Sequence, residues 1–470
     1  MKNYLSLKEI QKDIKKDTIT CQELVQGYIE NIKKEVHLNA FVDTYDKEAL
    51  EKALNIDKKI KAKKAGKLAG LIVGVKDNIC YKDHPSCASS KMLEGFSSTY
   101  SATVVDRLIS EDAIILGRLN CDEFAMGSST ENSVYGFSRN PIHTDYVAGG
   151  SSGGSAVAVK ANLCQVALGT DTGGSIRQPA AFCGVMGMKP TYGMVSRHGL
   201  IAYASSFDQI GPITKSIDDI IDVMDVISGG DEFDGTCVGT GWASQKISNN
   251  KTKTFAVIKE ALEFAGMHPG IKREFEQLIA RLISQGHKVK YIKLPMLEQL
   301  VPTYYVLTTA EASSNLARYD GIKYGYQAKK QNIQKLISDT RSRGFGREVK
   351  RRILLGTYVL SSGYYDEFYT KAQKIRRLIQ NETKSILSKH DYILLPTSPN
   401  IPFKIGEKNL QSTKLYYEDV FTVHANLSGN PAFSFPLGLA EKGFYASAQI
   451  IGDFFTEKDI LNTVQNVANN

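Results

Sequence analysis

Three segments of the sequence place serine, lysine and glycine in arrangements that could support nucleophilic catalysis. The first ends in Lys76, which directly follows the apolar run "LIVGV". The second is "GGSSGGS" at 149–155, and the third is "TDTGGSIRQPA" at 170–180. A lysine at the end of a buried strand is desolvated, which lowers its pKa and allows it to act as a base. Serine activated by such a lysine is a known variant of the catalytic triad.

The glycine-serine stretch at 149–155 is open to other interpretations. A flexible linker would separate two self-contained regions, whereas alternating helices and strands continue on both sides of it. A P-loop requires a lysine that 149–156 lacks. The G-x-S-x-G pattern of a nucleophile elbow occurs twice, but no apolar strand precedes it. Five histidines follow the stretch, so their presence alone does not exclude a Ser-His triad: His198, His268, His287, His390 and His424.

The elements that must position these segments are predicted from hydrophobic periodicity. The apolar stretch 68–79, bounded by glycines, predicts a strand that ends near Lys76. Residues 155–175 predict a small-residue helix, a strand and then a second glycine-rich turn. A helix and a strand return the chain to the same edge of a sheet. We therefore expect Ser175 to lie beside Ser151.

The rest of the chain shows the same alternation of helix and strand. Thr20-x-x-Glu23 is a capping box that predicts the start of a helix. Further segments follow: helix 46–64, helix then strand 102–120, strand 255–260, helix 269–287, strand 288–294 and strand 391–399. With no repeat, low-complexity stretch or clear linker, the pattern predicts one α/β domain over residues 1–470.

Composition narrows the class of protein further. The chain has 470 residues, of which 42% are hydrophobic and 23% charged, as in soluble globular proteins. No apolar run is long enough for a membrane span, and no signal peptide is apparent. The seven cysteines form no CxxC pair, which predicts a reduced, cytoplasmic protein without a metal site. The net charge of +8 is assigned to solvated helix faces, because no basic stripe with aromatics is present.

The three segments together resemble the amidase signature family. They occur in the family's order, as "GVKDN" at 74–78, "GGSSGGS" at 149–155 and "GGSIR" at 173–177. The resemblance implies an α/β fold with a large mixed β-sheet covered by helices on both faces. It implies that Ser175 is the nucleophile, and that Ser151, presented by a cis peptide after Gly150, is the proton relay. Lys76 would be the base.

Longer segments are similar to one branch of this family, the A subunits of tRNA-dependent amidotransferases. They are "CDEFAMGSSTENS" at 121–133 and the segments 187–212, 310–321 and 348–366. The resemblance implies a glutaminase that supplies ammonia for converting Glu-tRNA(Gln) to Gln-tRNA(Gln), or Asp-tRNA(Asn) to Asn-tRNA(Asn). It implies a heterotrimer with GatB-like and GatC-like subunits. This chain would need no cofactor, and the partner subunit would bind ATP, Mg and most of the mischarged tRNA.

Two other hypotheses remain from the sequence. A free-standing amidase could act on other small amides with the same serines and lysine. A non-catalytic scaffold could use the positive charge to bind tRNA, and its function would not depend on Ser175.

The resemblance also implies a glutamine pocket made by Tyr304, Arg352 and Asp419. Arg352 would pair with the α-carboxylate of glutamine, and Asp419 with its α-ammonium. The neighbouring Tyr305 and Arg351 are alternatives for the first two positions, because the assignment is uncertain by one residue.

The nucleophile turn carries predictions of its own. Glycines let its backbone N–H groups approach and stabilise an oxyanion, and the predicted donors are Thr172, Gly173, Gly174 and Ser175. Asp171 and Arg177 are predicted to form a structural ion pair across this turn. Ser152 and Ser155 are predicted to cap the helix that follows the first turn.

Overall fold

The computed structural model describes most of the chain, namely residues 2–239, 241–248, 251–329, 332–407 and 417–468. These residues form an 11-stranded sheet in the order β1-β3-β2-β4-β6-β5-β10-β11-β9-β7-β8. The strands are β1 (Phe41–Thr44), β2 (Ile72–Lys76), β3 (Ile114–Leu119), β4 (Val166–Thr170), β5 (Met186–Lys189), β6 (Ile210–Thr214), β7 (Thr254–Ile258), β8 (Lys288–Ile292), β9 (Tyr392–Pro396), β10 (Ala432–Glu441) and β11 (Phe444–Ile451).

The sheet is mixed, as the resemblance implied. The pairs β2/β3, β2/β4, β7/β8 and β7/β9 are parallel. The pairs β1/β3, β4/β6, β5/β6, β5/β10, β10/β11 and β9/β11 are antiparallel. One sheet thus includes strands from both halves of the chain.

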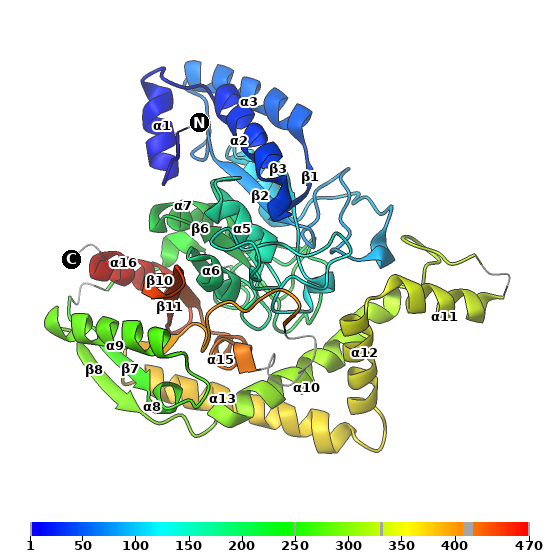
Figure 1. Ribbon diagram of the computed structural model, residues 1–470, viewed down its shortest axis with the longest axis vertical. Coiled ribbons are helices and arrows are strands. Elements are labelled where there is room, and N and C mark those ends of the chain that lie inside the picture. The colour runs from blue at the N-terminus through cyan, green and yellow to red at the C-terminus, as the bar shows by residue number, and fades with distance from the viewer. Residues whose placement is uncertain (1, 240, 249–250, 330–331, 408–416, 469–470) are drawn as a thin grey trace.

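Helices pack on both faces of the sheet (Figure 1). The main helices are α1 (Leu7–Lys15), α2 (Cys21–Lys34), α3 (Asp46–Lys61), α4 (Thr103–Ser110), α5 (Gly153–Lys160), α6 (Arg177–Cys183), α7 (Ile217–Ile227), α8 (Lys259–Leu262), α9 (Pro269–Ser284), α10 (Leu297–Asn315), α11 (Ile333–Gly344), α12 (Arg347–Val359), α13 (Lys371–Leu387), α15 (Val423–Ser428) and α16 (Glu457–Ala468). Figure 1 shows α11 and α12 reaching out from the body of the molecule.

The side chains of β7 alternate between two of the apolar cores that pack on the sheet. In β7, Phe255 and Val257 join the core packed by α4, α7, α9 and α16, whereas Ala256 and Ile258 join the core packed by α10 and α13. Successive side chains of a strand point to opposite faces. A sheet with a core on each face needs helices on each face, so the predicted fold class is confirmed.

The predicted elements are present, with shorter limits. The capping box at Thr20 and Glu23 opens α2. The strand predicted over 68–79 is limited to Ile72–Lys76, because Gly70 at a φ of +92° turns the chain just before it. Within the described ranges, no helix is both long and apolar enough to cross a membrane.

Candidate active site

Two neighbouring parallel strands bring the first candidate residues together. Lys76 is the last residue of β2 and Thr170 is the last residue of β4. The two strands pair in parallel, with Val75 opposite Leu168. Their C-terminal ends therefore lie at the same edge of the sheet, which is where α/β proteins usually place their sites.

The amine of Lys76 is surrounded by three hydroxyl groups. Its Nζ lies 2.7 Å from Ser151 Oγ, 2.9 Å from Ser152 Oγ and 2.7 Å from Thr170 Oγ1. Lys76 has no solvent exposure. Burial lowers the pKa of Lys76 to about 8, although nearby acidic groups, Asp122 among them, oppose the shift. The neutral amine is therefore well populated in weakly alkaline solution.

The hydrogen bonds distinguish the two serines beside Lys76. The hydroxyl of Ser152 donates to the carbonyl of Thr170 at 3.1 Å and accepts the N–H of the same residue at 3.2 Å. A hydroxyl has one hydrogen to donate, so that of Ser152 is already engaged. This leaves Ser151 as the serine able to give its proton to Lys76.

Neither Ser152 nor Ser155 caps α5, so that prediction was wrong. Ser152 occupies the N-cap position, but no side-chain capping bond forms there. The hydroxyl of Ser155 instead donates to the carbonyl of Leu168 at 3.1 Å. Both hydroxyls therefore donate to carbonyl oxygens of β4 rather than to the N-terminal N–H groups of α5.

The loop that carries Ser151 is held from several sides. The peptide bond between Gly150 and Ser151 is cis. The N–H of Gly150 donates to Gln178 Oε1 at 2.9 Å, and Thr130 Oγ1 donates to the carbonyl of Gly149 at 2.8 Å. The carbonyl of Ser151 accepts the N–H of Asp122 at 3.1 Å.

Ser175 lies in the second glycine turn, directly beside the first. The N–H of Ser152 donates to the carbonyl of Ser175 at 3.1 Å, which joins the two turns. The Ser175 hydroxyl has no hydrogen-bond partner among the described residues, and the residue is 8% exposed. Its side chain must therefore turn toward Ser151 to pass on a proton, and catalytic hydrogen bonds often tighten only when substrate binds.

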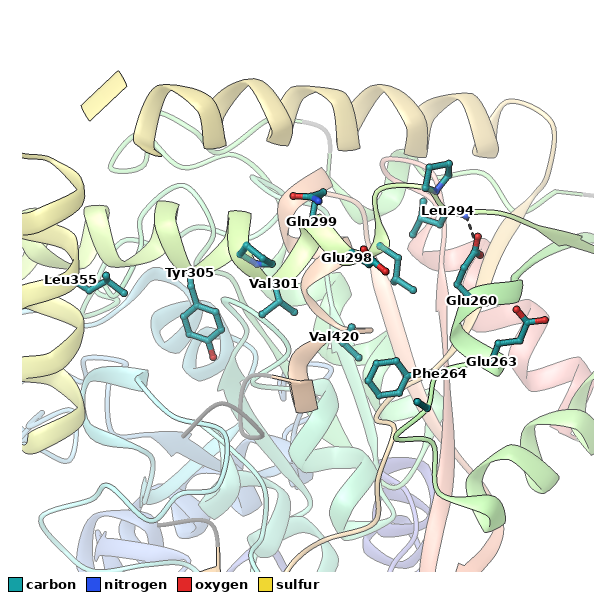
Figure 2. Close-up of a pocket in the computed structure, with 14 residues that line it drawn as sticks. Glu260, Glu263, Phe264, Leu294, Glu298, Gln299, Val301, Tyr305, Leu355 and Val420 are labelled. Carbon is teal, nitrogen blue, oxygen red and sulfur yellow. Dashed lines mark hydrogen bonds between the residues drawn. The ribbon is translucent and has the colours of Figure 1, made fainter. Parts of the chain in front are cut away.

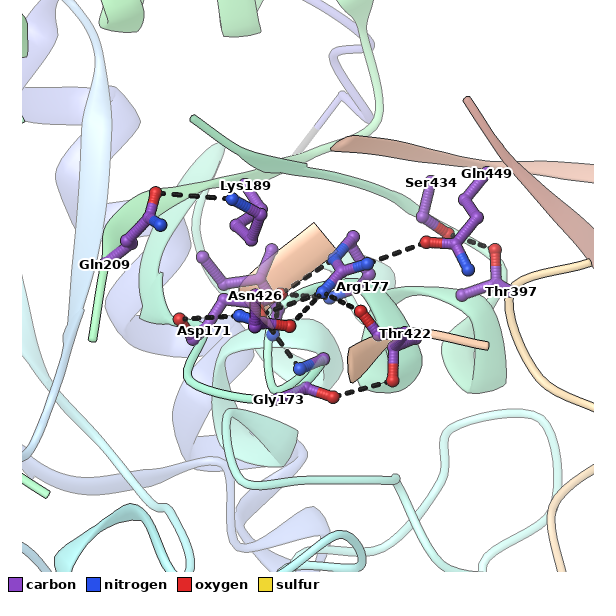
Figure 3. Close-up of polar contacts among 12 residues, drawn as sticks. Asp171, Gly173, Arg177, Lys189, Gln209, Thr397, Thr422, Asn426, Ser434 and Gln449 are labelled. Carbon is purple, nitrogen blue, oxygen red and sulfur yellow. Dashed lines mark hydrogen bonds and ion pairs between the residues drawn. The ribbon is translucent and has the colours of Figure 1, made fainter. Parts of the chain in front are cut away.

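A buried carboxylate organises the nucleophile turn (Figure 3). Asp171 accepts the N–H of Gly174 at 2.8 Å and that of Ile176 at 3.2 Å. The predicted ion pair is present, with Arg177 Nε 3.0 Å from Asp171 Oδ2. Burial alone would raise the pKa of Asp171, but the attraction of Arg177 outweighs it and holds this pKa at about 2. The carboxylate is therefore charged throughout the physiological pH range.

Arg177 also connects this turn to the C-terminal part of the chain. It donates to the carbonyl of Thr422 at 2.9 Å, to Asn426 Oδ1 at 2.7 Å and to Gln449 Oε1 at 2.7 Å. The hydroxyl of Thr422 donates to the carbonyl of Gly173 at 2.6 Å. Figure 3 shows these groups converging on the arginine. Sequence reasoning missed all three partners of Arg177, because no local pattern links residues so far apart in the chain.

Of the four backbone N–H groups predicted as oxyanion donors, that of Gly174 is already bonded to Asp171. Those of Thr172, Gly173 and Ser175 bond to no residue in the described part of the chain. We propose these three as the donors. Gly174 itself has a φ of +127°, and a Cβ there would lie 2.3 Å from Thr422 Oγ1, so this position requires glycine.

The arginine predicted to bind glutamine is buried near the turn. Arg352 Nε donates to Glu348 at 2.8 Å, and Nη1 donates to the hydroxyl of Tyr203 at 2.7 Å. Its guanidinium lies 5.5 Å and 5.3 Å from the ring centroids of Tyr203 and Tyr305. The Arg352 side chain is 8% exposed and that of Arg351 is 42% exposed. We therefore propose Arg352, rather than Arg351, as the arginine that binds glutamine. Tyr203, which holds the Arg352 side chain, was missed by sequence reasoning.

Asp419 and the two tyrosines complete this part of the site. Tyr305 donates its hydroxyl to Asp419 Oδ2 at 3.2 Å. Tyr304 instead packs against the nucleophile turn, where a Cβ on Gly173 would lie 2.5 Å from its hydroxyl. Burial raises the pKa of Asp419 to about 7, against the opposing effects of Arg352 and Tyr305. We propose Tyr305, rather than Tyr304, as the tyrosine that acts with Arg352 and Asp419 to bind glutamine.

These two pKa values predict how activity depends on pH. Asp419 must lose its proton to pair with an ammonium, and Lys76 must lose its proton to act as a base. Their pKa values are about 7 and about 8. We expect kcat/KM for glutamine to rise between pH 6 and 9, because this ratio reports ionisations of the free enzyme.

The measurement is ammonia release at low glutamine concentration across that pH range. Asp419→Asn should keep the rise near pH 8 and lose the one near pH 7. An activity that is highest at pH 6 would contradict both assignments.

The fold and the comparisons with known proteins define the class of this protein, which is an amidase. The sequence matches the amidase family model over residues 23–461. The chain belongs to the amidase signature family. Its fold resembles that of the peptide amidase from Stenotrophomonas maltophilia, with a TM-score of 0.81, 25% identity and coverage of 99% of this chain and 96% of the other.

Within the family, the chain is similar to the A subunits of glutamyl-tRNA(Gln) amidotransferases. It is 44% identical over 468 residues to the one numbered 2 from Clostridium acetobutylicum, covering 98% of both chains. It is 47% identical to the one from Caldanaerobacter subterraneus subsp. tengcongensis, covering 97% of this chain and 94% of the relative. The crystal structure of the one from Thermotoga maritima matches with a TM-score of 0.80 and 38% identity, over 99% of this chain and 96% of that one.

Proposed function

We propose that this protein is the glutaminase subunit of a tRNA-dependent amidotransferase. The observation that carries the proposal is the pairing of a serine-lysine site with a buried cation and a buried acid. Arg352 and Asp419 fit the α-carboxylate and α-ammonium of free glutamine. The names of the relatives at 44% to 47% identity, all A subunits of such enzymes, support the same function.

The proposed mechanism combines the observed contact between Lys76 and Ser151 with a proton transfer from Ser175 to Ser151. Neutral Lys76 takes a proton from Ser151, which takes one from Ser175 as this serine attacks the amide carbon of glutamine. The N–H groups of Thr172, Gly173 and Ser175 stabilise the oxyanion; loss of one such donor typically costs about 10²–10³ in rate. Ser151 then returns a proton to the leaving ammonia, and water hydrolyses the glutamyl ester of Ser175.

The ammonia would be consumed elsewhere in an assembly. We propose GatB-like and GatC-like partner subunits, with ATP, Mg and most contacts to mischarged tRNA on the partner that performs the ligation. We propose a cytoplasmic location and a single amidase domain, the latter because one sheet includes strands from residue 41 to residue 451.

The test is a glutaminase assay of the chain alone and of the chain co-expressed with both partners. The assay of the assembly includes ATP and mischarged tRNA. We expect strong stimulation of glutamine hydrolysis by the complete assembly, and amidation of the tRNA. High activity of the chain alone on unrelated small amides, with no stimulation, would favour a free-standing amidase instead.

Arg352→Lys tests the glutamine pocket. A lysine cannot reproduce the planar contact with a carboxylate, and hydrogen bonds between charged groups contribute about 1.5–3 kcal/mol. We therefore expect the KM for glutamine to rise roughly 10- to 100-fold, with a smaller change in kcat. Arg351→Lys is the matched control, because Arg351 pairs with the same Glu348 but has a side chain that is 42% exposed. Equal effects of the two substitutions would refute the assignment.

A further inference from the structure

A large pocket lies next to the glutamine site, and apart from Tyr305 its lining plays no part in the proposed function. Its volume is about 1130 Å³, slightly above the roughly 300–1,000 Å³ typical of ligand sites. Much of its lining is apolar, and includes Phe264, Val301, Leu355 and Val420. Figure 2 shows Tyr305 near one end of this lining, on α10.

The charged groups of the pocket are acidic. Glu260, Glu263 and Glu298 line it together with apolar side chains. Glu260 also accepts the N–H of Leu294 at 3.2 Å, the contact drawn in Figure 2. Three carboxylates disfavour the α-carboxylate of glutamine, whereas the apolar lining suits an alkyl or aromatic group.

Tyr305 lines the pocket and also contacts two residues of the proposed glutamine site, Arg352 and Asp419. Its hydroxyl bonds to Asp419, and its ring lies 5.3 Å from the Arg352 guanidinium. Its ring also meets that of Tyr304 edge-on at 5.1 Å, and Tyr304 packs on the nucleophile turn at Gly173. The half-buried side chain of Tyr305 therefore stands between the apolar pocket and the Arg352 and Asp419 side chains of the glutamine site.

We propose that Tyr305 is the residue that determines substrate size, because its ring separates the glutamine site from the neighbouring pocket and so excludes the acyl chains that the pocket would accept. The substrates so excluded are primary amides with long apolar or aromatic acyl chains. This inference rests on the proposed glutaminase function, which it deepens by assigning its specificity.

A variant without the Tyr305 ring would hydrolyse the larger amide by the same chemical steps as glutamine. The Ser175 oxygen would bond to the amide carbon of the larger substrate, the C–N bond would break, and ammonia would leave with the proton returned by Ser151. Water would then hydrolyse the ester to the carboxylic acid. The reaction is the hydrolysis of R–CO–NH₂ to R–COOH and NH₃, balanced with one water.

The experiment compares wild type, Tyr305→Ala and Tyr305→Phe on glutamine and on 6-phenylhexanamide, with ammonia release as the measurement. We expect Tyr305→Ala to raise kcat/KM for 6-phenylhexanamide at least tenfold and to raise the KM for glutamine. Tyr305→Phe keeps the ring and loses the bond to Asp419, so its effect on glutamine binding should be about fivefold. It should raise the glutamine KM without any gain on the larger amide.

A second substitution links the gain to the pocket. Val301→Trp added to Tyr305→Ala fills the pocket from α10, and should abolish the new activity. Tyr305→Leu is measured alongside Tyr305→Ala as a second variant that lacks the ring. The Tm of each variant shows whether it is folded.

The proposal is overturned if a folded Ala or Leu variant gains nothing on 6-phenylhexanamide, if Tyr305→Phe gains as much, or if Val301→Trp leaves the gain intact. These results are separable from the proposed function. A wild-type protein that hydrolyses glutamine while no variant gains activity refutes only the role of Tyr305 in substrate size. If the wild-type protein is inactive on glutamine but Tyr305→Ala gains activity on 6-phenylhexanamide, only the proposed glutaminase function is refuted.

Discussion

Ser175→Ala should reduce kcat/KM for glutamine by about 10⁴-fold or more, since loss of a catalytic serine in serine hydrolases costs up to roughly 10⁶-fold. The alanine removes the only atom that can bond to the amide carbon. The oxyanion donors and the Arg352–Asp419 pair stay in place, so glutamine should still bind. Glutamine hydrolysis by the purified assembly is the measurement.

Two controls separate loss of the nucleophile from loss of the fold. The assembly carrying Ser175→Ala should still amidate tRNA when ammonium chloride replaces glutamine, because ammonia bypasses the chemistry of this chain. Ser155→Ala removes a buried hydroxyl of the first turn that bonds to Leu168, and should keep glutamine activity within about tenfold, since one neutral hydrogen bond contributes about 1 kcal/mol. Substantial glutaminase activity of Ser175→Ala would refute the mechanism and favour a scaffold.

Lys76→Arg should be nearly as damaging although it retains the positive charge. The guanidinium of arginine does not lose its proton in proteins, so it cannot accept one from Ser151. Loss of a general base typically costs about 10²–10⁴-fold. We expect the upper part of that range here, because Ser151 and Ser175 both depend on Lys76. The rise in activity near pH 8 should also disappear.

Lys189→Met is the matched control for removing a buried lysine. Lys189 is fully buried, and burial lowers its pKa to about 7, yet it donates to the carbonyl of Pro190 and makes no contact with either serine among the described residues. We expect this variant to keep most of its activity in the folded fraction. If Lys76→Arg retained activity similar to that of Lys189→Met, Lys76 would not be the base.

Much of the fold could be predicted from local patterns. Glycine-bounded apolar runs indicated β2 and β4, and the capping box indicated α2, because periodicity and capping depend on residues close in sequence. The limits were less certain. The strand at 68–79 proved shorter, since the predicted stretch included the turn at Gly70.

The site was predicted in outline and refined by contacts that sequence spacing does not encode. Ser151 and Ser152 are equivalent in the motif, and only the bond from Ser152 to Thr170 distinguishes them. Helical spacing likewise could not separate Arg352 from Arg351, because the difference is which of them faces the core. The sequence predicted the N–H of Gly174 as an oxyanion donor, but this N–H donates to Asp171 instead.

The sequence by itself determined the order of the three motifs, the alternation of helices and strands that brings Lys76, Ser151 and Ser175 to one edge of the sheet, and the family. Short-range regularities carry that information. The tertiary structure alone decided how the nucleophile turn is fixed. Arg177 reaches Thr422, Asn426 and Gln449, separated from it by 245 to 272 residues. Such pairings depend on how the whole sheet packs, and no local pattern specifies them.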